Sequence, residues 1–293
     1  MTRAISSLFA TSLLAACSQN IASGPATPAE PEVVGHGTIS TEAPEFAFSL
    51  SPDGRTAYFN RIGEGGEIFI QVSRKDGDAW GPSSPIHFSD SRYPDVDPFV
   101  SRDGTRLYFS STRPRPGSAT DAAEADMDTW YAEWTGDGWS VPAHAGDLIN
   151  SPRDEVFVSE AENGTLAFAR FGEGEGRDRP TQIMLAARDG NGFAEPQAIA
   201  TLPADLRLSN PAIAPNGNLM VVSASTGPEP DLYVSRRNID DSWTEFTALP
   251  EPINSPDSAE FAPYIGNEGK TLYFTSERGG QAGRAIYRAE LPG

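Results

Sequence analysis

Four carboxylates recur at one fixed position of a repeated segment, and they are the residues best placed to do chemistry. Each stands three residues before an aligned position that is proline in three of the five segments. The four are Glu45, Asp95, Glu155 and Glu260, with Leu208 at the fifth equivalent position. Clustered carboxylates can bind cations, amines or sugar hydroxyls, or act as acid and base.

Four arginines follow these carboxylates at a similar distance in each segment, and their recurrence predicts that each pairs with a carboxylate. They are Arg61, Arg113, Arg170 and Arg278. Two interpretations stay open. The ion pairs could serve the structure alone, or they could form a mixed-charge pocket for an anionic or zwitterionic ligand. No catalytic residue is assigned. If the protein were a glycosidase, Asp95, Glu155 and Glu260 would serve as base, pKa modulator and acid.

The segment Pro114–Met127 is acidic and could offer oxygen ligands to Ca²⁺. Its candidates are Asp121, Glu124 and Asp126, with Asp128 at the start of the next strand. Their spacing matches no loop with defined ligand positions, so a solvated acidic loop is expected and no metal is assigned. The sequence indicates no cofactor.

The elements that position these residues are five copies of one module. A glycine follows each aligned position by six residues, and these glycines are spaced by 50, 60, 53 and 52 residues. Asp-Gly and Asn-Gly pairs at this place predict a two-residue hairpin turn with positive φ. The glycines are Gly54, Gly104, Gly164, Gly217 and Gly269.

Each module contains the pattern of four short strands. The strand after the glycine is apolar on both faces, and a third strand follows, as at 67–70, 128–131, 182–185, 231–234 and 285–287. Fourth, outer strands are expected at 85–88 and 145–149. Four antiparallel strands in about 50 residues predict a blade of an all-β propeller.

The last module has no fourth strand before the chain ends, whereas residues 33–40 before the first module have no partner. Gly37–Phe46 matches the segment that starts at Ile253, so Val33–Ser40 is expected to complete the last blade. A five-bladed propeller closed by its N-terminal strand follows, over residues 32–293. The alternative is six blades, with the additional one in Arg170–Leu208.

The modules resemble the WD40-like repeats of TolB-type propellers. The shared pattern is clearest in Asp95–Arg113 and Glu260–Arg278, and it covers about 260 residues. This resemblance implies a propeller that binds other proteins. The TolB propellers themselves have six blades, which is why a sixth blade is kept as the alternative.

The first residues have the pattern of a targeting signal. Arg3 precedes an apolar stretch too short to span a bilayer, so residues 1–16 are expected to be a signal peptide. Leu14–Cys17 resembles the lipobox of bacterial lipoproteins, which implies lipidation of Cys17. Ser18 after the cysteine favours the periplasmic face of the outer membrane. Residues 17–31 are Pro- and Ala-rich and are expected to be a disordered tether.

Composition limits the partners. The net charge is −19, from 41 acidic and 22 basic residues, which argues against nucleic acid as a ligand. Contact with the membrane is expected through the lipid anchor only. A single cysteine excludes an internal disulfide. The chain is expected to be monomeric.

Three functions remain. The first is a non-enzymatic binding module of the cell envelope, whose partners are envelope proteins or peptides. The second is a carbohydrate-active enzyme, because five-bladed propellers also include glycosidases that use channel carboxylates. The third is a sensor of a small molecule or a cation.

Overall fold

The structure is a computed structural model that describes residues 29–124, 126–173, 179–190, 192–199, 206–227, 229–279 and 283–292. Within these ranges the chain is all β and contains no helix. Accordingly, no helix of the described residues could span a membrane. The predicted signal peptide, Cys17 and most of the predicted tether lie outside the described residues.

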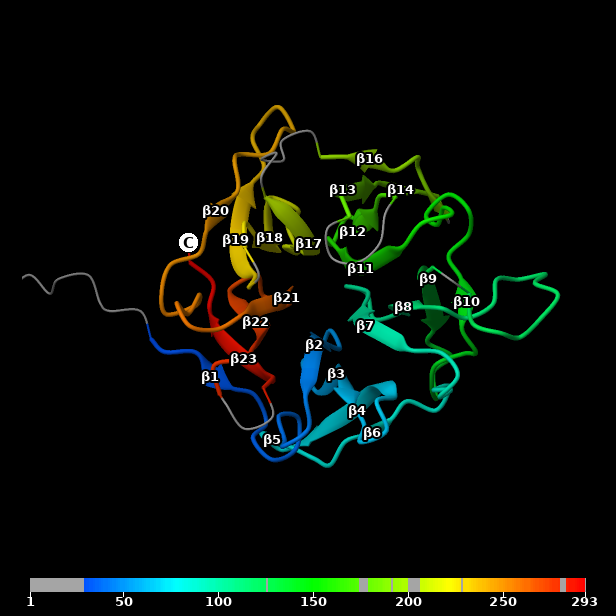
Figure 1. Cartoon of the computed structure of the whole chain (residues 1–293), viewed down its shortest axis with the longest axis horizontal. Coiled ribbons are helices and arrows are strands. Elements are labelled where there is room, and N and C mark those ends of the chain that lie inside the picture. Colours follow the sequence, from blue (N-terminus) through cyan, green and yellow to red (C-terminus); the bar gives the residue numbers. More distant parts are fainter. Residues whose placement is uncertain are drawn as a thin grey trace, which may run out of the picture.

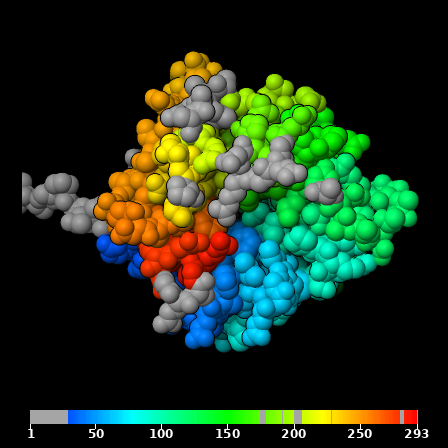
Figure 2. Space-filling model, in the orientation of Figure 1, coloured from blue at the N-terminus to red at the C-terminus, as the bar shows by residue number. Residues whose placement is uncertain are grey.

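The described strands form five antiparallel sheets around one axis, which confirms the predicted five-bladed propeller (Figure 1). The sheets follow one another in chain order around the molecule, as the colours of the space-filling view show (Figure 2). The inner strands are β2 (Glu45–Leu50), β7 (Asp95–Val100), β11 (Glu155–Glu160), β17 (Arg207–Ile213) and β21 (Glu260–Ile265). The second strands are β3 (Thr56–Ile62), β8 (Arg106–Ser111), β12 (Leu166–Phe171), β18 (Leu219–Ser225) and β22 (Thr271–Ser276).

The third strands lie where the sequence predicts them, and each pairs with a short outer strand. The third strands are β4 (Ile68–Asp76), β9 (Asp128–Glu133), β13 (Thr181–Ala186), β19 (Asp231–Arg236) and β23 (Ala285–Glu290). The outer strands are β6 (Ser84–Pro85), β10 (Ala143–His144), β16 (Gln197–Ala198), β20 (Thr247–Ala248) and β1 (Glu32–Val33). Three further strands, β5 (Ala79–Trp80), β14 (Arg188–Asp189) and β15 (Gly192–Phe193), form hairpin tips.

The ring closes as predicted, through the N-terminal strand. Strand β1 pairs with β23, with Glu32 opposite Arg288 and Val33 opposite Tyr287 (Figure 1). No sixth blade is present among the described residues. Those between Arg170 and Leu208 instead form the outer half of the third blade and the small β14–β15 hairpin.

The predicted bounds of the outer strands were wrong, because these strands are only two residues long. After the two paired residues the chain turns inward to cross to the next blade. The apolar residues that suggested longer strands are instead buried under this crossover: Ile39, Ile86 and Ile149 are at most 5% exposed. They anchor the connection rather than extend the sheet.

The inner hairpins also differ from the predicted two-residue turn. In the first blade Gly54 donates its N–H to the carbonyl of Ser51, and Ser51 donates to the carbonyl of Thr56. Gly54 has a φ of 67°, whereas Asp53 is not among the residues with positive φ. The Asp53 carboxylate instead accepts the N–H of Arg55. The glycine is therefore required, and the acidic residue stabilises the turn through its side chain.

The second strand of each blade provides the centre of the core. Phe59, Phe109, Phe168 and Phe274 occupy one equivalent position and are all fully buried. Val222 takes this position in the fourth blade and is buried too. Burying an aromatic side chain of this size stabilises the fold by roughly 1.5–3 kcal/mol.

Arg102 closes the channel at the end where the inner strands finish. Its guanidinium donates to the carbonyls of Glu160, Ile213 and Ile265, one from each of three other blades. It also donates to the Asn267 side chain, whose amide donates to the Ser51 carbonyl of the first blade. One side chain from the second blade thereby connects all five blades across the axis.

Replacing Arg102 with Met is expected to lower the free energy of unfolding by about 3 kcal/mol or more. Buried carbonyls of three blades would lose their donor, and each unsatisfied group costs about 1–3 kcal/mol. Denaturant unfolding of the full chain measures the effect. Arg102→Lys, which keeps the charge without the planar fork, should fall between Met and the natural chain. Equal stability of Met and natural chains would contradict this role.

Candidate functional site

The four repeated carboxylates are each bound to an arginine of the same blade, as their spacing predicts. The shortest nitrogen–oxygen distances are 2.7 Å for Glu45–Arg61, 2.6 Å for Asp95–Arg113, 2.7 Å for Glu155–Arg170 and 3.1 Å for Glu260–Arg278. The carboxylates are at most 1% exposed. Burial raises the pKa of Asp95 and of Glu155, and the hydrogen bonds and positive charge of the paired arginine act in the opposite direction.

The same ion pairs hold the crossover between neighbouring blades. Glu155 accepts the backbone N–H and the hydroxyl of Ser151, which lies in that crossover. Arg170 donates to the carbonyl of Ile149 in the same segment. Glu45 binds Thr41 in the corresponding way. These contacts occupy the carboxylate oxygens with groups of the chain itself.

The four carboxylates do not line the small cavity on the axis of the propeller. Glu45 lies directly opposite Arg61 in the β2–β3 ladder, and Glu155 lies opposite Arg170 in the β11–β12 ladder. In both pairs the carboxylate is bound to an arginine of the second strand of its own blade.

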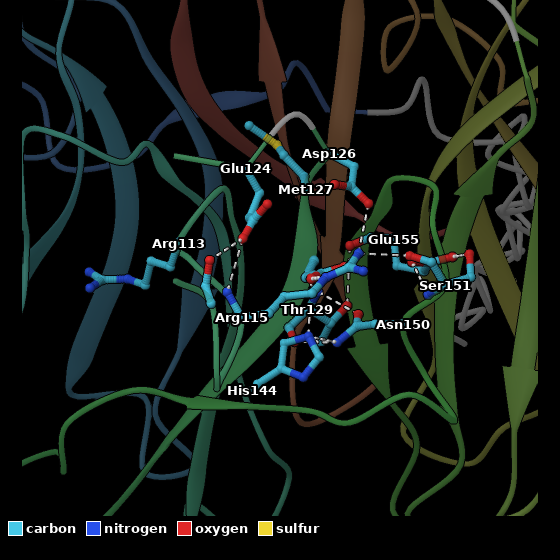
Figure 3. Close-up of polar contacts among 12 residues, drawn as sticks. Arg113, Arg115, Glu124, Asp126, Met127, Thr129, His144, Asn150, Ser151 and Glu155 are labelled. Atoms are coloured by element: carbon cyan, nitrogen blue, oxygen red, sulfur yellow. Dashed lines mark hydrogen bonds and ion pairs between the residues drawn. The ribbon is translucent and has the colours of Figure 1, made fainter. Parts of the chain in front are cut away.

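Arginines pair with acidic side chains of the insertion between β8 and β9 (Figure 3). Arg115 binds Asp126 at 2.7 Å and Asp128 at 2.5 Å. Asp121 pairs with Arg92 at 2.7 Å. Within the described part of the chain no group of three His, Cys, Asp or Glu residues could hold a metal ion. The carboxylates of Asp121, Asp126 and Asp128 are therefore bound to arginines of the chain itself.

His144, on β10, takes part in this network. Its Nε2 lies 3.0 Å from the Asp128 carboxylate and 2.9 Å from the Asn150 amide (Figure 3). Burial raises the pKa of Asp128, but its bonds to His144 and Arg115 lower it by more, so the net shift is downward. The Asp128–His144 pair is buried and joins the outer strand β10 to β9, so its role is structural.

A different set of residues faces the axis. Each inner strand contains a β-bulge at its middle, and the bulged residue has a positive φ although it is not glycine. These five residues are Ala47, Asp97, Phe157, Asn210 and Ala262, with φ between 48° and 62°. Such conformations cost of order 1–3 kcal/mol each and persist only where the surroundings enforce them.

The bulges surround a small cavity on the axis, which we call the channel cavity. Its volume is about 40 Å³. It is lined by the five bulged residues together with Phe48, Pro98, Pro211, Pro263 and Tyr264. Arg102 lies beyond the ends of the inner strands, so among the described residues the cavity is closed on that side.

Asp97 is the acidic residue of this cavity. Asn60 of the first blade fixes its backbone: the Asn60 amide donates to the Asp95 carbonyl and accepts the Asp97 N–H, both at 2.8 Å. The Asp97 carboxyl is 7% exposed and has no ion pair or hydrogen bond with the described residues. Burial alone raises the pKa of Asp97 to about 8.

Asp97 was not among the residues predicted from the sequence to bind a ligand. The available signal was its place two residues after an aligned carboxylate, where the other blades have Ala, Phe, Asn and Ala. The acidic residues that recur in most copies are bound to arginines, whereas Asp97 occurs in one copy and has no such partner among the described residues. The residue that departs from the repeat is the one that is free to bind a ligand.

No family model and no curated protein matches the chain. Among solved structures, it is similar to a putative TolB from Agrobacterium tumefaciens (TM-score 0.51, 13% identity, 86% of this chain and 92% of that one). It is also similar to a thermostable family-43 glycoside hydrolase (TM-score 0.60, 9% identity, 86% and 90%). An α-L-arabinofuranosidase from Lactobacillus brevis gives a TM-score of 0.57 at 14% identity, over 87% and 93%. At these identities the likeness shows the fold.

The raised pKa of Asp97 predicts an unusual dependence of stability on pH. Because the folded state binds the proton more tightly than the unfolded chain, stability should fall as pH rises from about 4 through about 8. Asp97→Asn removes the ionisation, so it should flatten this profile and raise stability at pH 9 by up to a few kcal/mol. Denaturant unfolding at pH 5, 7 and 9 measures this. Identical profiles for both chains would contradict it.

Proposed function

We propose that this protein is a non-enzymatic binding propeller, anchored by a lipid at the periplasmic face of the outer membrane. Envelope proteins or peptides are its partners, and they contact the end of the propeller where the inner strands begin. The lipobox-like residues Leu14–Cys17 and the Pro-rich segment that follows them support the anchor. The likeness in fold to a putative TolB is compatible with such a role.

The observation that carries this proposal is the state of the carboxylates. Glu45, Asp95, Glu155 and Glu260 are buried and bound to arginines, so they are not available to a substrate. A cavity nevertheless stays open on the axis, with one acidic side chain in it. The geometry therefore supports recognition of a ligand better than acid–base chemistry.

A glycosidase is supported less well, although glycoside hydrolases share the fold. Hydrolysis of a glycosidic bond ordinarily needs two carboxyl groups on opposite sides of a sugar. Of the residues that line the channel cavity, Asp97 is the only acidic one. The candidates Asp95, Glu155 and Glu260 would have to leave their arginines and turn toward the axis before they could act.

The anchor is tested by replacing Cys17 with Ser. The natural chain is expected to incorporate radiolabelled palmitate and to remain with the outer-membrane fraction, whereas Cys17→Ser should lose the label and leave that fraction. Detergent extraction followed by immunoblotting measures the distribution. Ser18→Ala serves as the control, since it leaves the cysteine intact. An unlabelled natural chain would contradict the anchor.

The binding face is tested with a photo-crosslinking phenylalanine analogue at Phe157, which lines the channel cavity. A discrete cross-linked envelope protein is expected from this position. The same analogue at the fully exposed Ile239, which follows β19 at the opposite end of the propeller, is the matched control. Cross-links from Ile239 alone would contradict the proposed face. Hydrolysis of a glycan by the purified chain, lost in Asp97→Asn, would contradict the non-enzymatic role.

A further inference from the structure

The channel cavity holds a potential negative charge without a counter-charge. The Asp97 carboxyl reaches the cavity, is 7% exposed, and has no partner among the described residues. The four other acidic residues on the inner-strand starts all have arginine partners. An isolated buried carboxyl of this kind is costly unless something pairs with it.

Several backbone N–H donors around the cavity are missing or already bound. Three of its residues, Pro98, Pro211 and Pro263, have no N–H. The backbone N–H groups of Ala47 and Asp97 are already bound, to Thr275 and Asn60 respectively. The unpaired Asp97 carboxyl disfavours an anionic ligand group and favours one that brings hydrogen-bond donors and positive charge.

A second acceptor lies on the fourth blade. Asn210 occupies the position equivalent to Asp97, and its side-chain oxygen accepts a single bond from the Ser209 hydroxyl at 2.8 Å. A carbonyl oxygen has two lone pairs, so one remains for a ligand. The rings of Phe48, Phe157 and Tyr264 complete the lining, and aromatic faces attract cations.

The ligand set of the cavity limits the cation. Ca²⁺ takes six to eight oxygen ligands, more than one carboxylate and one amide can supply. A quaternary ammonium has no N–H to donate to these acceptors. A primary ammonium has three donors for them.

We infer that the channel cavity binds one primary ammonium group, which donates to the Asp97 carboxylate and to the Asn210 amide oxygen. The ammonium belongs either to a free alkylamine or to a lysine or N-terminus of a protein partner. The second source rests on the proposed binding function, whereas the cavity itself does not. The net charge of −19 favours the approach of either.

Binding of the ammonium should displace a proton and therefore tighten as pH rises. The neighbouring titratable groups are Arg102, Glu160 and Tyr264. Arg102 and Glu160 bind each other at the closed end of the channel, and burial raises the pKa of Tyr264 to about 12. Burial also raises the pKa of Glu160, so the Asp97 variant is needed to assign the effect.

The test measures the melting temperature of the full chain, purified in detergent, with methylammonium chloride at pH 6 and pH 9. Alkylammonium groups stay charged up to about pH 10. We expect an upward shift of about 2 °C or more at pH 9 at ten times the dissociation constant, and a smaller shift at pH 6. Asp97→Asn should abolish the shift. This variant should fold, because asparagine already occupies the equivalent position at residue 210.

The controls decide between outcomes. Asp78→Asn removes an exposed carboxylate and should keep the full shift. An equal effect of tetramethylammonium, Na⁺ or Ca²⁺, or an undiminished shift in Asp97→Asn, would overturn the inference. Binding of a short lysine peptide, but not of its acetylated form, identifies a protein source. Binding of methylammonium without binding of the peptide identifies a free amine. If neither binds while Phe157 still cross-links a partner, the inference fails and the proposed function stands.

Discussion

The structure depends on how five strands can converge on one axis without leaving buried carbonyls unpaired. The inner strands end side by side but are not hydrogen-bonded to one another, so their last carbonyls face a space that excludes water. Arg102 satisfies three of these groups with one planar guanidinium and reaches a fourth blade through Asn267. A lysine would present a single point charge, whereas the guanidinium has donors directed along several lines.

The ion pairs and the strained bulges have different structural roles in each blade. Each Arg–carboxylate pair fixes the crossover that enters a blade, so the start of the inner strand is held in place. The bulge then redirects the middle of that strand and leaves room on the axis. Asn60 shows how the strain is maintained, since its two bonds bracket the bulge of the next blade. The cavity exists because residues outside its lining, such as Asn60, hold the bulges in place.

Most of the fold could be predicted from the sequence, because the sequence pattern of a blade occurs five times. Glycine spacing identified the hairpins, and the unmatched residues 33–40 identified the closing strand. The Arg–carboxylate pairing also followed from recurrence. The direction of those side chains could not be predicted, because a strand pattern does not say whether its first residue faces the axis or its own sheet. Asp97 was missed for a related reason: alignment emphasises what the copies share, and the bulge is visible only in φ.

The pairing of β1 with β23 has a consequence for how the protein is made. Glu32 and Arg288 are joined although 256 residues separate them along the chain. Closing a flexible loop of that length costs on the order of 5 kcal/mol of entropy. The last blade therefore lacks two of its four strands, β23 and β1, until β23 has left the ribosome, and the preceding blades have to remain soluble as an open arc. Completion of the ring is then a single late event, because it needs β23 as well as β1.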